Sequence, residues 1–132
     1  MKIEATHLDG LRLALRSGRW SIETDQRTEY GGEDTGPMPS ELFLWSIAAC
    51  YGQAVAHVGR KMRAPMDGLR LEVEGQKDRE ASRFSAVTVT VFAPSCPAPQ
   101  LEKVAEHAKR ICYVTNSISP SLEVRFEVKG LE

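Results

Sequence analysis

Apolar and polar residues alternate along the first part of the chain, and this pattern predicts a β-hairpin. Residues 11–15 (Leu-Arg-Leu-Ala-Leu) and residues 19–24 (Arg-Trp-Ser-Ile-Glu-Thr) show the alternation on either side of Ser17 and Gly18. Two alternating runs around a glycine-containing turn are typical of antiparallel strands. Residues 2–6 offer a further short strand before this hairpin.

Apolar and polar residues also alternate in three segments of the second half of the chain. The alternation is strict in residues 69–74 (Leu-Arg-Leu-Glu-Val-Glu) and 84–92, which are joined by the charged stretch 76–82. They therefore predict a long antiparallel pair with one face on the core. Residues 122–128 (Leu-Glu-Val-Arg-Phe-Glu-Val) predict a final strand.

A long apolar helix is predicted between these groups of strands. Residues 30–39 carry three glycines and two prolines, which indicates a loop. Ser40 is expected to cap the helix, with Glu41 favourable in its first turn, and the helix should end near Arg63. Its apolar residues fall on almost every face, so it must be covered all round. Because one sheet covers only one side, we expect a second copy of the chain to cover the rest.

A second helix follows the prolines at positions 94, 97 and 99. Its apolar residues fall on one stripe at helical spacing: Leu101, Val104, Ala105, Ala108, Ile111 and Cys112. Strands and helices in this order predict an α+β fold, an antiparallel sheet packed on two helices. The length fits a single domain over residues 1–132.

The composition of the chain bears on whether it binds nucleic acid or a membrane. The chain has 132 residues, 42% of them hydrophobic, and a net charge of -1, which is ordinary for a soluble globular protein and gives no reason to expect nucleic acid. The uncharged stretch 42–56 is shorter than the roughly 20 residues of a membrane span. The N-terminus does not resemble a signal peptide, and three cysteines are an odd count. We expect a cytoplasmic protein without a membrane partner.

The cysteines are the candidates for a chemical role in this chain. Cys50 lies inside the uncharged helix, and Cys112 lies on the apolar face at the end of the second helix. Each alone is typical of an inert core residue. Two core-facing thiols in a reducing compartment nevertheless suggest a redox pair, in which one thiolate attacks a peroxide and the other closes a disulfide. A helix C-terminus disfavours a thiolate, so Cys50 is expected to attack and Cys112 to resolve. Cys96, in the loop 94–97, is expected to be peripheral.

Several motifs in this order resemble the OsmC/Ohr family, the osmotically inducible protein C and organic hydroperoxide resistance proteins. They are Gly31-Gly32, then Gly36-Pro37-Met38-Pro39-Ser40-Glu41-Leu42, then Ala48-Ala49-Cys50, and finally Lys109-Arg110-Ile111-Cys112-Tyr113-Val114-Thr115. The resemblance implies an intertwined homodimer with two active sites at the subunit interface and thiol-dependent reduction of organic hydroperoxides. It makes Cys50 the peroxidatic thiol and Cys112 the resolving one. A dithiol such as a lipoyl group would reduce the disulfide again, with no metal or organic cofactor.

The chain departs from the family pattern at several positions. Tyr113 stands where the family usually has proline, Thr115 where serine is common, and Ser40 in the slot that usually holds glutamate. The acid here is Glu41, nine residues before Cys50. At about 100° and 1.5 Å per residue, Glu41 lies on the opposite face of the helix and roughly 13 Å along its axis. We expect it either to act across the dimer or to stabilise the helix start.

The resemblance also implies an arginine that pairs with the reactive thiolate. Arg19 is the best match, and Arg16 and Arg27 are alternatives, because this stretch has no fixed spacing to the cysteine. Apolar neighbours of Cys50 (Phe43, Trp45, Ile47 and Tyr51) favour small or fatty alkyl hydroperoxides. Two other functions stay open: a non-catalytic protein that binds an apolar ligand, and a redox sensor that oxidises without turnover.

Overall fold

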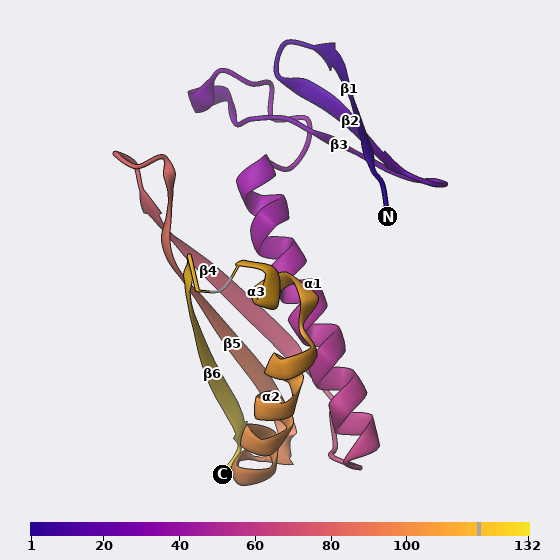
Figure 1. Cartoon of the computed structure of the whole chain (residues 1–132), viewed down its shortest axis with the longest axis vertical. Helices are drawn as coiled ribbons and strands as arrows, with labels where there is room; N and C mark the ends of the chain where they lie inside the picture. Colours follow the sequence, from indigo (N-terminus) through magenta and orange to yellow (C-terminus); the bar gives the residue numbers. More distant parts are fainter. Residues whose placement is uncertain (119) are drawn as a thin grey trace. The chain divides into compact units, whose positions relative to one another are not determined.

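The structure, a computed structural model, describes residues 1–118 and 120–132. It contains two compact units, residues 1–43 and 44–132 (Figure 1). Helix α1 (Pro39–Lys61) begins in the first unit and continues into the second. The expectation of a single domain over residues 1–132 stays a prediction.

The first unit is built on a three-stranded antiparallel sheet in the order β1-β2-β3. Its strands are β1 (Glu4–Asp9), β2 (Arg12–Ser17) and β3 (Trp20–Thr24). Gly10 and Gly18 occupy the two hairpin turns with φ of 48° and 58°, a conformation that glycine adopts without steric cost. The predicted hairpin and the additional N-terminal strand are therefore confirmed. A short 3₁₀ helix η1 (Thr28–Tyr30) follows β3.

The start of α1 differs from the predicted cap. Met38 is the capping residue, because its carbonyl accepts the first helical hydrogen bond from the Leu42 N–H at 3.1 Å. The Glu41 carboxylate reaches back to accept from the Met38 N–H at 3.0 Å, which is one half of a capping box. Pro39 fills the first helical position, where its missing N–H costs nothing. Ser40 therefore lies inside the helix, and its predicted role as the cap was wrong.

By length and composition alone, α1 is able to cross a membrane. This is weak evidence, because the core helix of a soluble protein passes the same test. Only 33% of its most apolar window is buried inside a single chain, so much of the apolar surface of the helix has no cover in this structure. The sequence-based expectation that a second surface covers α1 stays a prediction.

The second unit contains a separate three-stranded sheet in the order β4-β5-β6. Its strands are β4 (Arg70–Asp78), β5 (Arg83–Pro97) and β6 (Glu123–Leu131). The predicted antiparallel pair β4–β5 is confirmed, but β6 runs parallel to β5. The single antiparallel sheet of the sequence-based fold was therefore wrong in two respects, since there are two sheets and one pairing is parallel. The α+β class is confirmed.

The parallel pairing has a topological cause. Between β5 and β6 the chain passes through α2 (Ala98–Ile111) and α3 (Tyr113–Ile118), and a helical crossover returns the chain to the end where the previous strand began. Strand β5 also continues through Pro94 to Pro97, beyond its predicted end. As a result Cys96 is a buried strand residue and not a peripheral loop residue.

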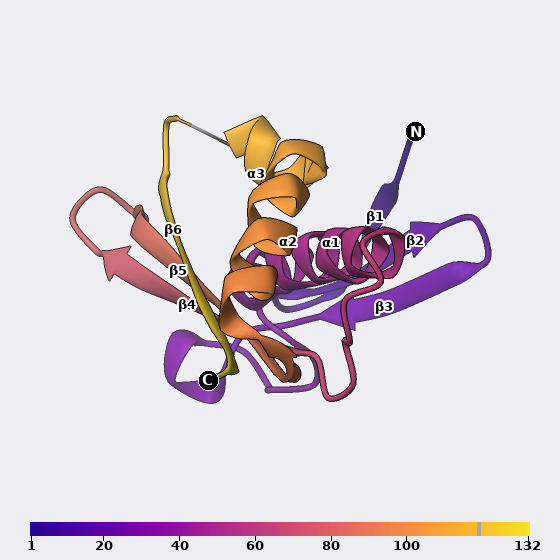
Figure 2. The same cartoon turned by 90° about the horizontal axis from the view of Figure 1, so that it is seen from below.

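Helices α1 and α2 pack on the same face of the second sheet (Figure 2). Alternate residues of β5 point into this layer and are buried: Val87, Val89, Val91 and Ala93. The predicted stripe of α2 meets them through Leu101, Val104, Ala105 and Ala108, all buried. Complete burial of a valine or leucine side chain stabilises a fold by about 1.5–3 kcal/mol, so this layer holds the two helices in place.

Candidate functional site

The structure brings Cys50 and Cys112 together within the second unit. Cys50 lies on α1, while Cys112 ends α2 immediately before α3. Cys50 is close enough to raise the pKa of Cys112, and both cysteines are free thiols. Residues 62 positions apart in the sequence are thus neighbours in the fold.

The two thiols have different environments. Cys112 is completely buried, whereas Cys50 is partly exposed. Burial raises the pKa of Cys112; hydrogen bonds from the side chain and backbone of Thr115 lower it, and the neighbouring Cys50 raises it further. The net pKa is above the ordinary value, so Cys112 stays protonated near neutral pH.

Cys112 occupies the junction of two helices and not simply the end of one. Its carbonyl accepts the first hydrogen bond of α3 from the Asn116 N–H at 3.0 Å. Burial is the largest cause of the raised pKa of Cys112. The Thr115 hydroxyl donates to the Cys112 carbonyl at 3.4 Å. Tyr113 is the first residue of α3 and highly exposed. Proline is favoured at that position but not required there, so the departure from the family pattern leaves the helix intact.

Tyr51, the residue after Cys50, anchors α1 to α2. Its side chain is fully buried, and its hydroxyl donates to the Ala105 carbonyl at 3.1 Å. Its ring packs on Phe126 of β6 with centroids 4.8 Å apart. Burial raises the pKa of Tyr51 far above its usual range, so the hydroxyl remains a donor. Sequence analysis assigned Tyr51 to a substrate-facing surface, but it is a core residue that fixes the position of the neighbouring thiol.

In the first unit, Glu41 pairs with Arg27. Both carboxylate oxygens of Glu41 accept from Nη2 of Arg27 at 2.9 Å, while Nη1 donates to Asp34 at 2.7 Å. All three side chains are partly exposed, so each pair is worth at most about 1 kcal/mol. The effect is chiefly geometric, since two carboxylates hold one guanidinium in a fixed orientation.

The loop that carries this ion-pair network is organised by Asp25, whose side chain is buried. The carboxylate accepts from the N–H groups of Gln26, Glu33 and Thr35 at 2.8, 3.1 and 3.2 Å and from the Thr35 hydroxyl at 2.9 Å. Burial raises the pKa of Asp25, but the hydrogen bonds from Gln26, Thr35 and Glu33 outweigh it, and the net pKa is lowered. This residue was not among the sequence-based candidates, because its contacts lie in a loop without a periodic pattern.

Two glycines allow the loop to close on Asp25. A Cβ on Gly32 would meet the Gln26 carbonyl, and a Cβ on Gly36 would lie 2.5 Å from the Glu23 carbonyl. Both contacts are with backbone, which cannot move aside easily. Side chains at these positions are therefore incompatible with the observed loop.

The other two candidate arginines are placed differently. The Arg19 guanidinium lies over the Trp20 ring, 4.7 Å from its centroid, in the turn between β2 and β3. Arg16 lines a shallow surface pocket with Lys2, Glu4 and Gly18. Of the three candidate arginines, Arg27 is the one that pairs with Glu41. Which arginine serves the Cys50 thiolate stays a prediction.

Cys96 and possible metal ligands are the remaining candidates for a chemical role in the part of the chain that the structure describes. Cys96 is buried at the end of β5, and burial raises its pKa. Among residues 1–118 and 120–132, no group of three or more His, Cys, Asp or Glu side chains is placed to hold a metal ion.

Comparison with known proteins gives consistent matches. The family described as OsmC-like protein matches residues 31–127. The organic hydroperoxide resistance protein OhrB of Bacillus subtilis is 28% identical over 100 residues, which cover 72% of this chain and 71% of that protein. Its crystal structure aligns with a TM-score of 0.69 at 23% identity, covering 97% of this chain and 96% of that one. An OsmC-like protein of Mycoplasma pneumoniae aligns with a TM-score of 0.87 at 15% identity, covering 99% and 96%.

Proposed function

Because the chain belongs to the OsmC-like protein family, we propose that it reduces organic hydroperoxides with the thiols of Cys50 and Cys112. The observation that carries this proposal is the proximity of the two free thiols, which are close enough for Cys50 to raise the pKa of Cys112. The relationship to an organic hydroperoxide resistance protein supports the choice of substrate class.

In the first step, the Cys50 thiolate attacks one oxygen of the hydroperoxide. An S–O bond forms as the O–O bond breaks, and the departing alkoxide takes up a proton and leaves as an alcohol. Cys50 becomes a sulfenic acid, and the peroxide gains two electrons. The peroxide must reach the attacking sulfur, and Cys50 is the more exposed of the two thiols.

In the second step, Cys112 attacks the sulfenic sulfur of Cys50. A disulfide forms, and the sulfenic hydroxyl leaves as water with the proton of the Cys112 thiol. The raised pKa of Cys112, caused first by its burial, keeps that proton in place until it is needed. A dithiol reductant, of the lipoyl type or another cellular thiol, then exchanges with the disulfide and becomes a disulfide itself. The cycle uses no metal or organic cofactor.

The Cys50 thiolate also needs a positive group to stabilise it. Among the three candidate arginines we favour Arg27, because Asp34 and Glu41 fix its guanidinium, whereas Arg19 is engaged with Trp20. Glu41 then acts by orienting that arginine, in addition to its role at the start of α1.

The preference for alkyl hydroperoxides rests on the family relationship and not on the apolar neighbours singled out in the sequence. Ile47 and Tyr51 are completely buried in the core of the second unit and cannot line a substrate pocket. Trp45 is 59% exposed and remains a candidate apolar contact.

We also propose a homodimer. Large apolar side chains of the first unit are exposed in the single chain, among them Ile3, Leu8, Leu11, Trp20 and Ile22. The long helix α1 is likewise only partly covered. Exposed apolar surface of this extent is typical of a protein–protein interface. A reducing cytoplasm is the compartment in which free thiols of this kind persist.

The experiment is a peroxidase assay with cumene hydroperoxide and a dithiol reductant, following disappearance of the peroxide. Wild type is expected to turn over, C50S to be inactive, and C96S to match wild type. Absence of turnover in wild type with any hydroperoxide would refute the enzyme. Oxidation to a disulfide that no dithiol reduces would identify a redox sensor instead.

A further inference from the structure

Strand β6 forms one edge of the second sheet and lies beside α2 (Figure 1, Figure 2). Within the described part of the second unit it pairs with β5 alone, and this register runs from Glu123 to Gly130 without a bulge. Edge strands are commonly protected by shortness, proline, a bulge or charged side chains. Of these devices β6 has only the charges, which alternate along its exposed face. Its outer backbone groups therefore form a long, regular edge that is open to pairing.

Two pockets lie between β6 and the helices α2 and α3. The larger one, the acidic pocket, has a volume of about 300 Å³ and is lined by Glu102, Ala105, Glu106, Lys109, Phe126 and Val128. The smaller one, the polar pocket, has a volume of about 200 Å³ and is lined by Lys109, Thr115, Asn116, Val124 and Phe126. Because both linings contain Lys109 and Phe126, the two pockets adjoin along the strand.

The pockets follow the two-residue period of β6. Val124, Phe126 and Val128 are successive residues on one face of the strand. The polar pocket contains the first two of them and the acidic pocket the last two. Successive side chains on one face of a strand are about 6.6–6.8 Å apart. The two pockets therefore match the spacing of alternate side chains on a strand added beside β6.

The acidic pocket carries an unbalanced negative charge. Lys109 Nζ lies 3.2 Å from a carboxylate oxygen of Glu106 and 4.9 Å from the centroid of the Phe126 ring, so the chain neutralises one of the two carboxylates itself. Among residues 1–118 and 120–132, Glu102 has no nitrogen of a basic side chain within 4.0 Å. Two carboxylates and one ammonium leave one negative charge, which complements a basic side chain.

We propose that β6 binds an extended peptide segment of another protein, which adds to the second sheet as a fourth strand. In strand addition, main-chain hydrogen bonds supply affinity and pockets for alternate side chains supply specificity. A lysine or arginine of the peptide enters the acidic pocket and pairs with Glu102. A small or aliphatic side chain two residues away enters the polar pocket and packs on Val124. The inference is independent of the thiol chemistry proposed above.

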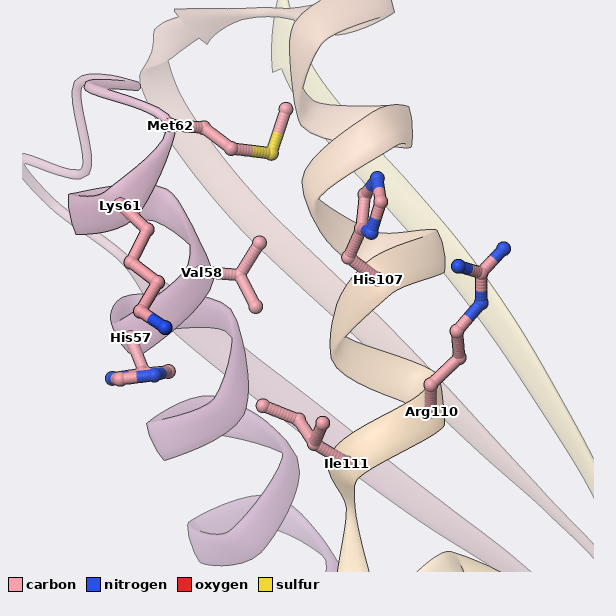
Figure 3. A pocket seen from close by; sticks show the side chains of 7 residues that line it. All are labelled: His57, Val58, Lys61, Met62, His107, Arg110 and Ile111. Carbon is pink, nitrogen blue, oxygen red and sulfur yellow. The ribbon is translucent and has the colours of Figure 1, made fainter.

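Two other features of the second unit serve as controls. The pocket between α1 and α2 is lined by basic side chains, among them Lys61 and Arg110, and by no carboxylate, so it disfavours a basic side chain of a peptide (Figure 3). The opposite edge of the sheet, β4, has a register shift between Gln76 and Lys77, which interrupts its regular pairing pattern. Neither feature is expected to respond to the peptide.

The test is fluorescence anisotropy of a labelled peptide, Ser-Val-Thr-Lys-Thr-Val-Ser with blocked ends, titrated with the full chain. In an added strand its valines and lysine share one face. We expect saturable binding below about 1 mM. A peptide with glutamine in place of the lysine should bind about fivefold more weakly, as expected for loss of an exposed ion pair. A peptide N-methylated at its three central residues should bind more than about tenfold more weakly, because it lacks main-chain donors.

Variants of the protein assign the lysine to its pocket. E102Q is expected to weaken binding of the lysine peptide about fivefold and to leave the glutamine peptide within about twofold. E74Q, on the exposed face of β4, and R110Q should leave both peptides within about twofold. C50S should bind like wild type. Glu102, Glu74 and Arg110 are all exposed, and the comparison of the two peptides with wild type needs no variant.

Hydrogen exchange with and without the lysine peptide locates the bound strand. Exchange in residues 123–131 is expected to slow, while exchange in residues 70–78 stays unchanged. The proposal is overturned by absence of saturable binding, by equal binding of the glutamine or N-methylated peptide, by equal effects of E102Q and E74Q, or by slowing at β4 instead of β6. Full protection of residues 123–131 in the free protein would show that a second copy of the chain covers this edge, and would overturn it as well.

Discussion

The Tyr51 hydroxyl donates a hydrogen bond of 3.1 Å to the carbonyl of Ala105 and so joins the helix of Cys50 to the helix that ends at Cys112. The bond lies in the core, where neither group has access to water. It therefore contributes both to stability and to the alignment of the two sulfurs.

Replacing Tyr51 with phenylalanine removes this bond, and the Ala105 carbonyl, which lies inside α2, loses its second donor. A hydrogen bond of this kind contributes about 0.5–1.5 kcal/mol, and we expect the free energy of unfolding of Y51F to fall by that amount. Urea titration at fixed protein concentration measures the loss. Tyr113, which is exposed, supplies the matched control: Y113F is expected to unfold like wild type. Equal stability of Y51F and wild type would contradict the role of the bond.

The Asp25 carboxylate predicts a pH dependence of stability. Although burial raises its pKa, the hydrogen bonds from Gln26, Thr35 and Glu33 lower it overall. A group whose pKa is lowered by folding stabilises the fold above its unfolded value of about 3.9, and this contribution is lost as the pH falls through the folded pKa. We therefore expect D25N to be less stable than wild type near neutral pH, with the difference shrinking at about pH 3.

Urea midpoints of D25N and wild type at the two pH values measure this effect. Asp67 is exposed and provides the control, because D67N should track wild type at both values. A D25N deficit that is the same at both pH values would show that the charge of Asp25 is not what stabilises the loop.

Much of the fold was predictable because alternation and helical spacing report local structure directly. The hairpin of the first unit, the pair β4–β5, and the apolar stripe of α2 all follow from such patterns. The direction of β6 was missed because residues 122–128 alternate in the same way whether the neighbouring strand is parallel or antiparallel. The helices between β5 and β6 were the available signal for a parallel crossover.

The two cysteines of the candidate site were predictable from the sequence, but their surroundings were not. Cys50 and Cys112 stand out by residue type and resemblance, and the structure makes them neighbours. The arginine that serves the Cys50 thiolate was left open among three, since this stretch has no fixed spacing to the cysteine. Asp25 was missed because its contacts join residues that no single helix or strand pattern connects.

The three candidate arginines differ in how firmly they are held, and this predicts which one supports the Cys50 thiolate. We expect R27Q to slow alkylation of Cys50 about tenfold near neutral pH, because the thiolate loses the positive group that stabilises it. R16Q and R19Q should react within about twofold of wild type. The measurement is the rate of labelling by monobromobimane in a C96S background. A larger effect at Arg19 would restore the sequence-based assignment.

Exposed apolar surface on both units predicts self-association. We expect sedimentation equilibrium at micromolar concentration to give twice the 14.6 kDa mass of one chain. Trp45 is 59% exposed on α1, and W45E is expected to shift the protein toward monomer because a charge opposes burial of that surface. A wild type that sediments as a monomer would refute the dimer.

The central claim is that Cys50 and Cys112 act as a redox pair, and mass spectrometry after one equivalent of cumene hydroperoxide tests it most directly. The account predicts that wild type loses two hydrogens and yields a peptide in which Cys50 is joined to Cys112. In C112S the same treatment should leave a sulfenic acid on Cys50 that reacts with dimedone. An unmodified Cys50, or a disulfide that joins Cys50 to Cys96 instead, would contradict the account.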